Sequence, residues 1–127
     1  MADWALDASA ALAFLLDEPG ADRVAMSLTS AMISSVNAAE VVDRLIRGGG
    51  QPHHARQLLL ALNCPIIPVD AELGLRAGML SASTRSFGLS LGDRVCLAMA
   101  EREQIPALTA DRAWRWLDLG IEVQLIR

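Results

Sequence analysis

Short apolar runs alternate along the chain with longer segments in which apolar residues recur every three or four positions. The short runs predict β-strands, and the longer segments predict helices that bury one face. We predict strands over residues 4–6, 32–35, 66–69, 107–109 and 121–126. We predict helices over residues 8–16, 21–28, 36–47, 52–62, 70–83 and 91–103, and a short tryptophan-containing helix after Asp111.

The order of these elements predicts the fold class. Three glycines at positions 48–50 end the third helix, and Pro52 suits the first turn of the fourth. Strands that alternate with helices predict an α/β fold, in which a mainly parallel sheet of about five strands carries helices on both faces. We expect one domain over residues 1–127. In such sheets, ligands bind beyond the carboxyl ends of the strands.

The composition suggests a protein with a partner. A domain of 127 residues buries enough surface to need no disulfide framework. Hydrophobic residues make up 53% of the chain and the mean hydropathy is +0.33, so we expect a partner or a second copy to cover apolar surface. Cys64 and Cys96 have no CxxC spacing, and we expect buried free thiols. The first residues carry no basic segment and the apolar stretches are short, so we expect a cytoplasmic protein without membrane contact.

The charged residues exclude several enzyme classes. The net charge of −4 argues against binding nucleic acid through a broad basic surface, and every basic residue is an arginine. A haloacid-dehalogenase-type phosphatase also has an aspartate after its first strand, but it needs a second aspartate two residues later and a lysine. Position 9 is serine here, and lysine is absent. A P-loop NTPase needs a GK[ST] sequence, which the chain lacks.

Four acidic residues, Asp7, Glu40, Asp93 and Asp111, stand out by their positions. Each has an ordinary explanation, because two follow strands as helix N-caps would, and the other two lie three residues after Asn37 or Ser90, as in a capping box. Their shared location favours a second explanation. Two of them follow strand ends, and two lie in the first turns of helices at the same edge, so the sheet can bring all four together.

A cluster of carboxylates predicts a hard divalent cation. Carboxylates packed together repel one another and raise each other's pKa, and bound Mg²⁺ or Mn²⁺ removes that cost. One or two such ions activate water and stabilise the leaving oxygen in phosphodiester hydrolysis, without a lysine, histidine or serine nucleophile. The pattern therefore predicts a metal-dependent hydrolase.

The acids lie in four blocks that resemble the PIN domain family and follow the family's order. The blocks are Leu6-Asp7-Ala8-Ser9-Ala10, Ile33-Ser34-Ser35-Val36-Asn37 with Glu40-Val41-Val42, the segment from Gly88 to Ala98, and Leu108-Thr109-Ala110-Asp111-Arg112-Ala113-Trp114. Together they resemble the VapC branch, the toxins of bacterial type II toxin–antitoxin pairs. The resemblance implies a PIN-like α/β/α sandwich and a Mg²⁺-dependent endoribonuclease that cuts structured cellular RNA, with Mn²⁺ as a possible substitute.

The resemblance also implies site residues and partners. Asp7, Glu40, Asp93 and Asp111 match the family's acidic quartet, and Ser9 and Thr109 match hydroxyls beside it. A homodimer and a cognate VapB-type antitoxin are the implied partners. A PIN-like module that binds RNA or acts as a scaffold, with weak or no catalysis, is the alternative.

Six other residues have a functional interpretation beside a structural one. Arg94 and Arg112 each follow an acid of the quartet, so they could bind RNA phosphate or pair with the acids. Trp114 and Trp116 cannot share a helix face, and we expect one in the core and the other partly exposed. The two histidines at positions 53 and 54 are expected to be exposed rather than to bind metal.

Overall fold

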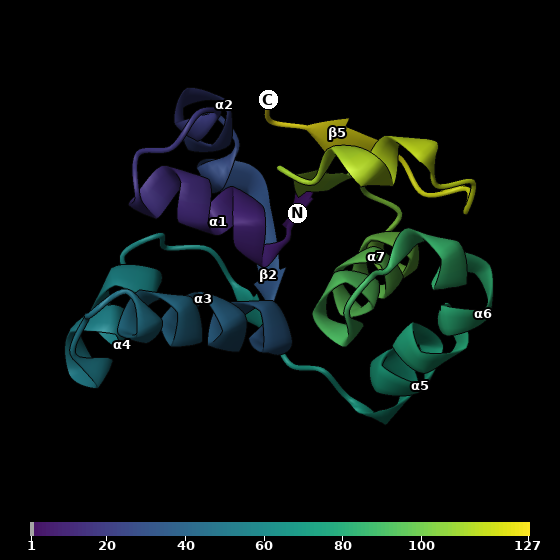
Figure 1. The fold of residues 1–127 in the computed structure, drawn as a ribbon, viewed down its shortest axis with the longest axis horizontal. Helices are drawn as coiled ribbons and strands as arrows, with labels where there is room; N and C mark the ends of the chain where they lie inside the picture. The colour runs from purple at the N-terminus through teal and green to yellow at the C-terminus, as the bar shows by residue number, and fades with distance from the viewer. Residues whose placement is uncertain (1) are drawn as a thin grey trace.

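Five parallel strands form one sheet at the centre of the computed structural model, which describes residues 2–127 (Figure 1). The strands are β1 (Trp4–Leu6), β2 (Ala31–Ser34), β3 (Ile66–Ile67), β4 (Ala107–Thr109) and β5 (Val123–Leu125). They lie in the order β3-β2-β1-β4-β5, and Leu6 in the central strand is in register with Ile33 and Leu108. The predicted α/β fold with a parallel sheet is confirmed.

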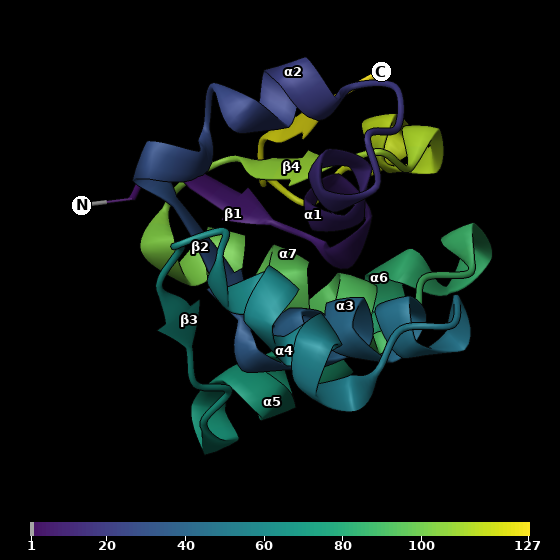
Figure 2. The same ribbon diagram turned by 90° about the vertical axis from the view of Figure 1, so that its left-hand side faces the viewer.

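Helices cover both faces of this sheet, as Figures 1 and 2 show. The α-helices are α1 (Ala8–Leu15), α2 (Ala21–Ala25), α3 (Ser35–Arg47), α4 (Pro52–Leu60), α5 (Ala71–Met79), α6 (Ser81–Thr84) and α7 (Leu91–Glu103). Short 3₁₀ helices are η1 (Leu28–Ser30), η2 (Arg85–Phe87) and η3 (Arg112–Trp116). Helices α1 to α4 pack on one face, and α5 and α7 pack on the other. The result is a three-layer α/β/α sandwich.

Alternation along the strands creates two separate hydrophobic cores. Leu6 and Leu108 point into the core beneath α1 to α4, whereas their neighbours Ala5 and Ala107 point into the core beneath α5 and α7. Trp114 is fully buried in the second core, while Trp116 is 67% exposed, which confirms the prediction for this pair.

The predicted boundaries of two helices and two strands were wrong. The predicted helix 21–28 stops after Ala25 and is followed by η1, and the predicted helix 70–83 is divided into α5 and α6 at Leu80. The Leu80 carbonyl accepts from both the amide and the hydroxyl of Thr84, at 3.1 and 2.8 Å. The strand predicted over 66–69 contains only two residues, because Pro68 has no N–H for the ladder. The last strand is likewise confined to β5 within the predicted 121–126.

The predictions about the exposure of the histidines and the burial of the cysteines are confirmed except for Cys64. His53 and His54 are exposed, as expected. Cys96 is a buried free thiol, as predicted, but Cys64 is only half-buried. No helix within residues 2–127 has the length and apolar character needed to cross a bilayer.

The strand order places a topological switch point between β1 and β4. From β1 the chain first builds the side of the sheet that carries β2 and β3, and then crosses to β4 on the opposite side of β1. The connections therefore diverge at the carboxyl ends of β1 and β4, which is the usual ligand-binding point of an open parallel sheet. Asp7 and Asp111 lie immediately beyond those two strand ends.

Candidate functional site

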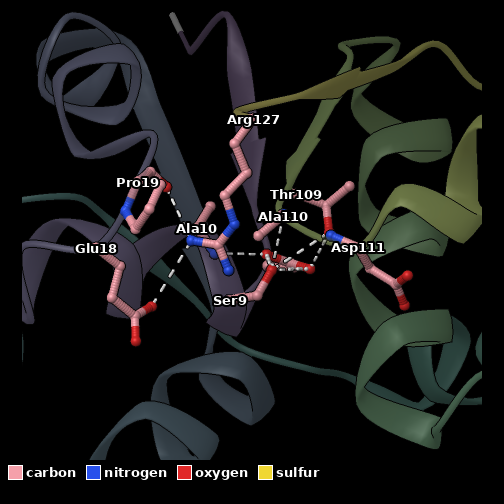
Figure 3. Close-up of polar contacts among 9 residues, drawn as sticks. Ser9, Ala10, Glu18, Pro19, Thr109, Ala110, Asp111 and Arg127 are labelled. Atoms are coloured by element: carbon pink, nitrogen blue, oxygen red, sulfur yellow. Dashed lines mark hydrogen bonds and ion pairs between the residues drawn. The ribbon is translucent and has the colours of Figure 1, made fainter.

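Asp7 lies at this switch point, with only 3% of its surface exposed. It is the N-cap of α1, and its Oδ1 accepts a hydrogen bond of 2.8 Å from the Ala10 amide. The Ser9 hydroxyl donates to Oδ1 at 2.7 Å, and the Thr109 hydroxyl donates to Oδ2 (Figure 3). The capping role expected from the sequence is therefore real, and hydroxyls from two elements also hold the carboxylate in place.

Glu40 is positioned by a capping arrangement different from the one expected. The N-cap of α3 is Ser34, whose hydroxyl oxygen accepts from the Asn37 amide at 2.9 Å, so the predicted capping-box pairing of Asn37 with Glu40 was wrong. The Asn37 side-chain amide instead donates to Glu40 Oε1 at 2.8 Å and to the Gly92 carbonyl at 3.0 Å. One buried amide thus connects Glu40 to the first turn of α7.

Asp93 lies in that first turn and forms the predicted capping box. Its carboxylate accepts from the Ser90 amide at 2.9 Å, and the Ser90 hydroxyl oxygen accepts from the Asp93 amide at 3.1 Å. Gly92 lets Glu40 approach the helix end, because a Cβ at this position would overlap both oxygens of the Glu40 carboxylate. The amide groups at a helix N-terminus favour nearby negative charge.

Asp111 is the most exposed acid of the quartet. Its Oδ1 accepts from the Ala113 amide at 3.0 Å, so it caps η3, and its own amide donates to the Thr109 hydroxyl at 3.0 Å. That hydroxyl also donates to Asp7, and one threonine therefore links the two strand-end acids. Figure 3 shows the Asp111 carboxylate pointing away from the bonded group around Thr109 and Ser9.

The negative charges of three of the four acids affect the same thiol, that of Cys96. Burial raises the pKa of the Cys96 thiol well above its usual value, and the negative charges of Asp7, Asp93 and Glu40 raise it further. Cys96 lies one turn beyond Asp93 in α7 and contacts the Ala5 carbonyl through its sulfur at 3.9 Å. The contacts agree with this grouping, because Glu40 lies against Gly92 beside Asp93, and Thr109 links Asp7 to the exposed Asp111.

Burial raises the pKa values of two of these carboxylates. Burial raises the pKa of Asp7 from 3.8 to about 6, against hydrogen bonds that lower it, and the charge of Asp93 contributes a smaller rise. Burial also raises the pKa of Glu40, and Asp93 again adds to the rise. Desolvation is thus the main cause, and repulsion between carboxylates, which the sequence predicted, is the lesser one.

The chemistry of these side chains fits a hard cation, although they do not form a closed cage. Carboxylate oxygens are the ligands that Mg²⁺ and Mn²⁺ prefer, and a nearby cation offsets the cost of ionising Asp7. Within residues 2–127, no three His, Cys, Asp or Glu side chains are arranged to enclose a metal ion.

The two predicted RNA-contact arginines differ in their surroundings. Arg94 is half-buried and donates to the Ala77 carbonyl of α5 at 3.3 Å, which directs it toward the layer of α5 and α7. Arg112 is exposed in η3 beside Asp111.

Sequence reasoning missed the roles of Asn37 and Gly92. Their signal was the Ser34-x-x-Asn37 spacing and a glycine in the first turn of a helix, both of which look like ordinary local structure. Only the contact between α3 and α7 shows that these residues position Glu40.

Four acidic residues around a buried Asp7, at the switch point of a three-layer parallel sheet, define an α/β protein with an acidic candidate site. The model of the PIN domain family matches residues 5–118, so the chain belongs to this family, whose members are in general nucleases. No curated protein matches the chain significantly in sequence.

Solved structures support the same fold. VapBC2 from Rickettsia felis, bound to a DNA fragment from its promoter, matches with a TM-score of 0.73 and 15% identity over 95% of this chain and 96% of that one. DNA-bound VapBC from Salmonella typhimurium matches with a TM-score of 0.71 and 15% identity over 100% of both chains. VapBC-5 from Mycobacterium tuberculosis matches with a TM-score of 0.60 and 22% identity over 98% of both chains.

Proposed function

We propose that this protein is a metal-dependent endoribonuclease that acts as the toxin of a VapBC-type pair in the cytoplasm. The observation that carries this proposal is that Glu40 lies against the first turn of α7 beside Asp93, at the same sheet edge as the buried Asp7, in a PIN domain. The fold match to chains in three VapBC structures supports the toxin part of the proposal.

Each residue of the candidate site has a separate role in this proposal. Asp7 is fixed by Ser9, Thr109 and the Ala10 amide, which makes it the rigid member of the cluster. Asn37 holds Glu40 beside α7. Asp93 and Asp111 complete the quartet through the carboxylate oxygens that their capping bonds leave free. Bound Mg²⁺ or Mn²⁺ would supply an activated water and stabilise the charge on the leaving oxygen.

The surface supports a partner. Eleven large hydrophobic side chains are exposed within the described residues, among them Met26, Leu75, Met79 and Trp116, each more than 60% exposed. Exposed apolar surface of this kind favours a second copy of the chain and a protein antitoxin as partners.

One observation favours the alternative of an RNA-binding module without catalysis. The carboxylates of Asp93 and Asp111 are engaged in helix caps, and no three acids form a metal cage within residues 2–127. If the acids also held no metal with RNA bound, the site would bind its ligand without cutting it.

Cleavage of a structured RNA by the purified protein distinguishes the two functions. We expect cleavage in Mg²⁺ or Mn²⁺, none in EDTA, and none by Asp7→Asn, because Asp7 is the acid held most firmly in place. The exposed acid Asp118 lies outside the cluster, and Asp118→Asn serves as the matched control with wild-type cleavage. Activity of Asp7→Asn, or activity of the wild type in EDTA, would refute the metal-site mechanism.

A further inference from the structure

A small polar pocket lies directly beside the acidic cluster, between α1, α3 and the end of the chain. Its volume is about 190 Å³. Small-molecule sites typically measure roughly 300–1,000 Å³, so this pocket suits a single phosphate group better than a whole nucleotide. The residues that line it are Ser9, Leu12, Leu16, Glu18, Arg44 and Arg127.

Ser9 connects the pocket to the candidate site. Its hydroxyl donates to both oxygens of Asp7, at 2.7 and 2.9 Å, while the same side chain lines the pocket. Figure 3 shows Ser9 between the bonded group around Thr109 on one side and the Arg127 side chain on the other. A ligand in the pocket would therefore be a close neighbour of any group bound at Asp7.

Arg127 is held in position before any ligand arrives. The preceding residue, Ile126, is buried and its amide donates to the Thr109 carbonyl at 3.0 Å, which fixes the backbone. The Arg127 guanidinium donates through Nη1 to the Pro19 carbonyl at 2.8 Å and lies 3.9 Å from Glu18 Oε1 (Figure 3). A guanidinium has five N–H donors, so most of its donors stay available to a phosphate.

Arg44 supplies the second positive charge. It lies four residues after Glu40 on α3, so the two side chains share a helix face about 6 Å apart along the axis. Within residues 2–127, the Arg44 side chain forms no hydrogen bond or ion pair, and it is exposed. The side chains of the two arginines outweigh that of Glu18, so the side chains that line the pocket carry a net positive charge.

We propose that Arg44 and Arg127 bind the phosphate of an RNA strand that neighbours the phosphate at the acidic cluster. The inference rests on the proposed endoribonuclease function and specifies how a protein with a net charge of −4 holds a polyanion. An acidic segment of a protein partner is the competing occupant. The pocket's small size and its shared wall with the Asp7 site favour the RNA phosphate.

Binding of fluorescently labelled single-stranded RNA tests the proposal without requiring cleavage. In an Asp7→Asn background with Mg²⁺, we expect Arg44→Gln and Arg127→Gln each to raise the Kd roughly 3- to 10-fold. Each should also reduce the slope of log Kd against log salt concentration by about 0.7, the value for one lost phosphate contact to a single strand. Glu18→Gln should lower the Kd, because it removes the competing carboxylate.

Arg102→Gln is the matched control. Arg102 lies in the last turn of α7, at the opposite edge of the sheet from Asp93, and pairs with Asp70 and Glu103. We expect its Kd and salt slope to equal those of the background protein. Arg127→Lys keeps the charge but loses the planar fork of donors, and it should recover only part of the affinity.

The outcomes separate this inference from the proposed function. In proteins with Asp7 intact, we expect the two arginine variants to raise KM while changing kcat by less than about 2-fold. Wild-type RNA cleavage together with unchanged RNA binding by both arginine variants would overturn the phosphate site and leave the nuclease standing. A wild type that cuts no RNA, with weaker binding by both variants, would support the phosphate site and refute the nuclease.

Discussion

At the scale of single residues, the site combines local stability with electrostatic cost. Asp7 caps α1 through the Ala10 amide, which stabilises the helix, yet its burial raises its pKa to about 6. Asp93 and Asp111 also cap helices, but they are more exposed. The capping and functional explanations of these acids are therefore compatible, because a carboxylate held by backbone amides still has oxygens to offer a ligand.

The raised pKa of Asp7 predicts that Asp7→Asn stabilises the metal-free protein. Between pH 3.8 and about 6 the folded state binds more protons at this site than the unfolded state, so the free energy of unfolding falls as pH rises. Above pH 6 the full cost of the buried charge remains. Asparagine carries no charge, and we expect Asp7→Asn to be more stable than the wild type by ~1–3 kcal/mol at pH 8.

Denaturant titrations of both proteins in EDTA, from pH 4 to pH 8, would measure this difference. It should be small at pH 4 and grow through pH 6. Addition of Mg²⁺ should stabilise the wild type more than the variant, because only the wild type has the buried charge to neutralise. An Asp7→Asn protein that is less stable than the wild type at pH 8 would contradict the conclusion that the buried Asp7 charge destabilises the fold.

At the scale of elements, the contact between α3 and α7 positions Glu40. Asn37 bridges Glu40 and the Gly92 carbonyl, and the absence of a side chain at position 92 leaves room for the carboxylate. The site therefore depends on how closely two helices approach each other, in addition to the acids that they carry.

Gly92→Ala should reduce RNA cleavage by at least about 10-fold, because the new methyl group displaces the Glu40 carboxylate. Gly78→Ala is the matched control, since a Cβ at this helical glycine of α5 has nothing within 4 Å. We expect Gly78→Ala to cleave RNA normally and to gain ~0.5–1 kcal/mol of stability from better helix propensity. Equal activity of the two variants would show that the position of Glu40 is unimportant.

At the scale of the whole molecule, an apolar surface remains after the two cores are filled. Leu75 and Met79 lie four residues apart on α5, so they share a face, and they are 68% and 65% exposed. The high hydrophobic content predicted such a surface, and its exposure favours association with a second copy.

We predict a homodimer by light scattering at roughly 10–50 µM protein, a range that detects moderately weak association. Replacing Leu75 and Met79 together by glutamine should lower the dimer fraction, because the variant removes apolar area from one face of α5. Met26→Gln, at an 80% exposed position beyond α2, is the control and should remain dimeric. A monomeric wild type at these concentrations would contradict the predicted dimer.

The sequence alone determined the order of the elements, the class of the fold and the identities of the four acids. Hydrophobic periodicity records which side of each element is buried, and capping residues such as Ser90 act within three or four positions. Those are local properties. Short elements were predicted less well, because the end of β3 depends on a single proline, which interrupts an otherwise apolar run.

Only the tertiary structure decided which residues position the acids and where a polyanion could lie. Thr109 reaches Asp7 across 102 positions of sequence, Asn37 reaches Gly92 across 55, and Arg127 reaches Pro19 across 108. Such contacts follow from the strand order and from helix packing, which no local pattern encodes. The same packing decides the burial that raises the pKa of Asp7. The acids could therefore be found from the sequence, whereas their environment required the fold.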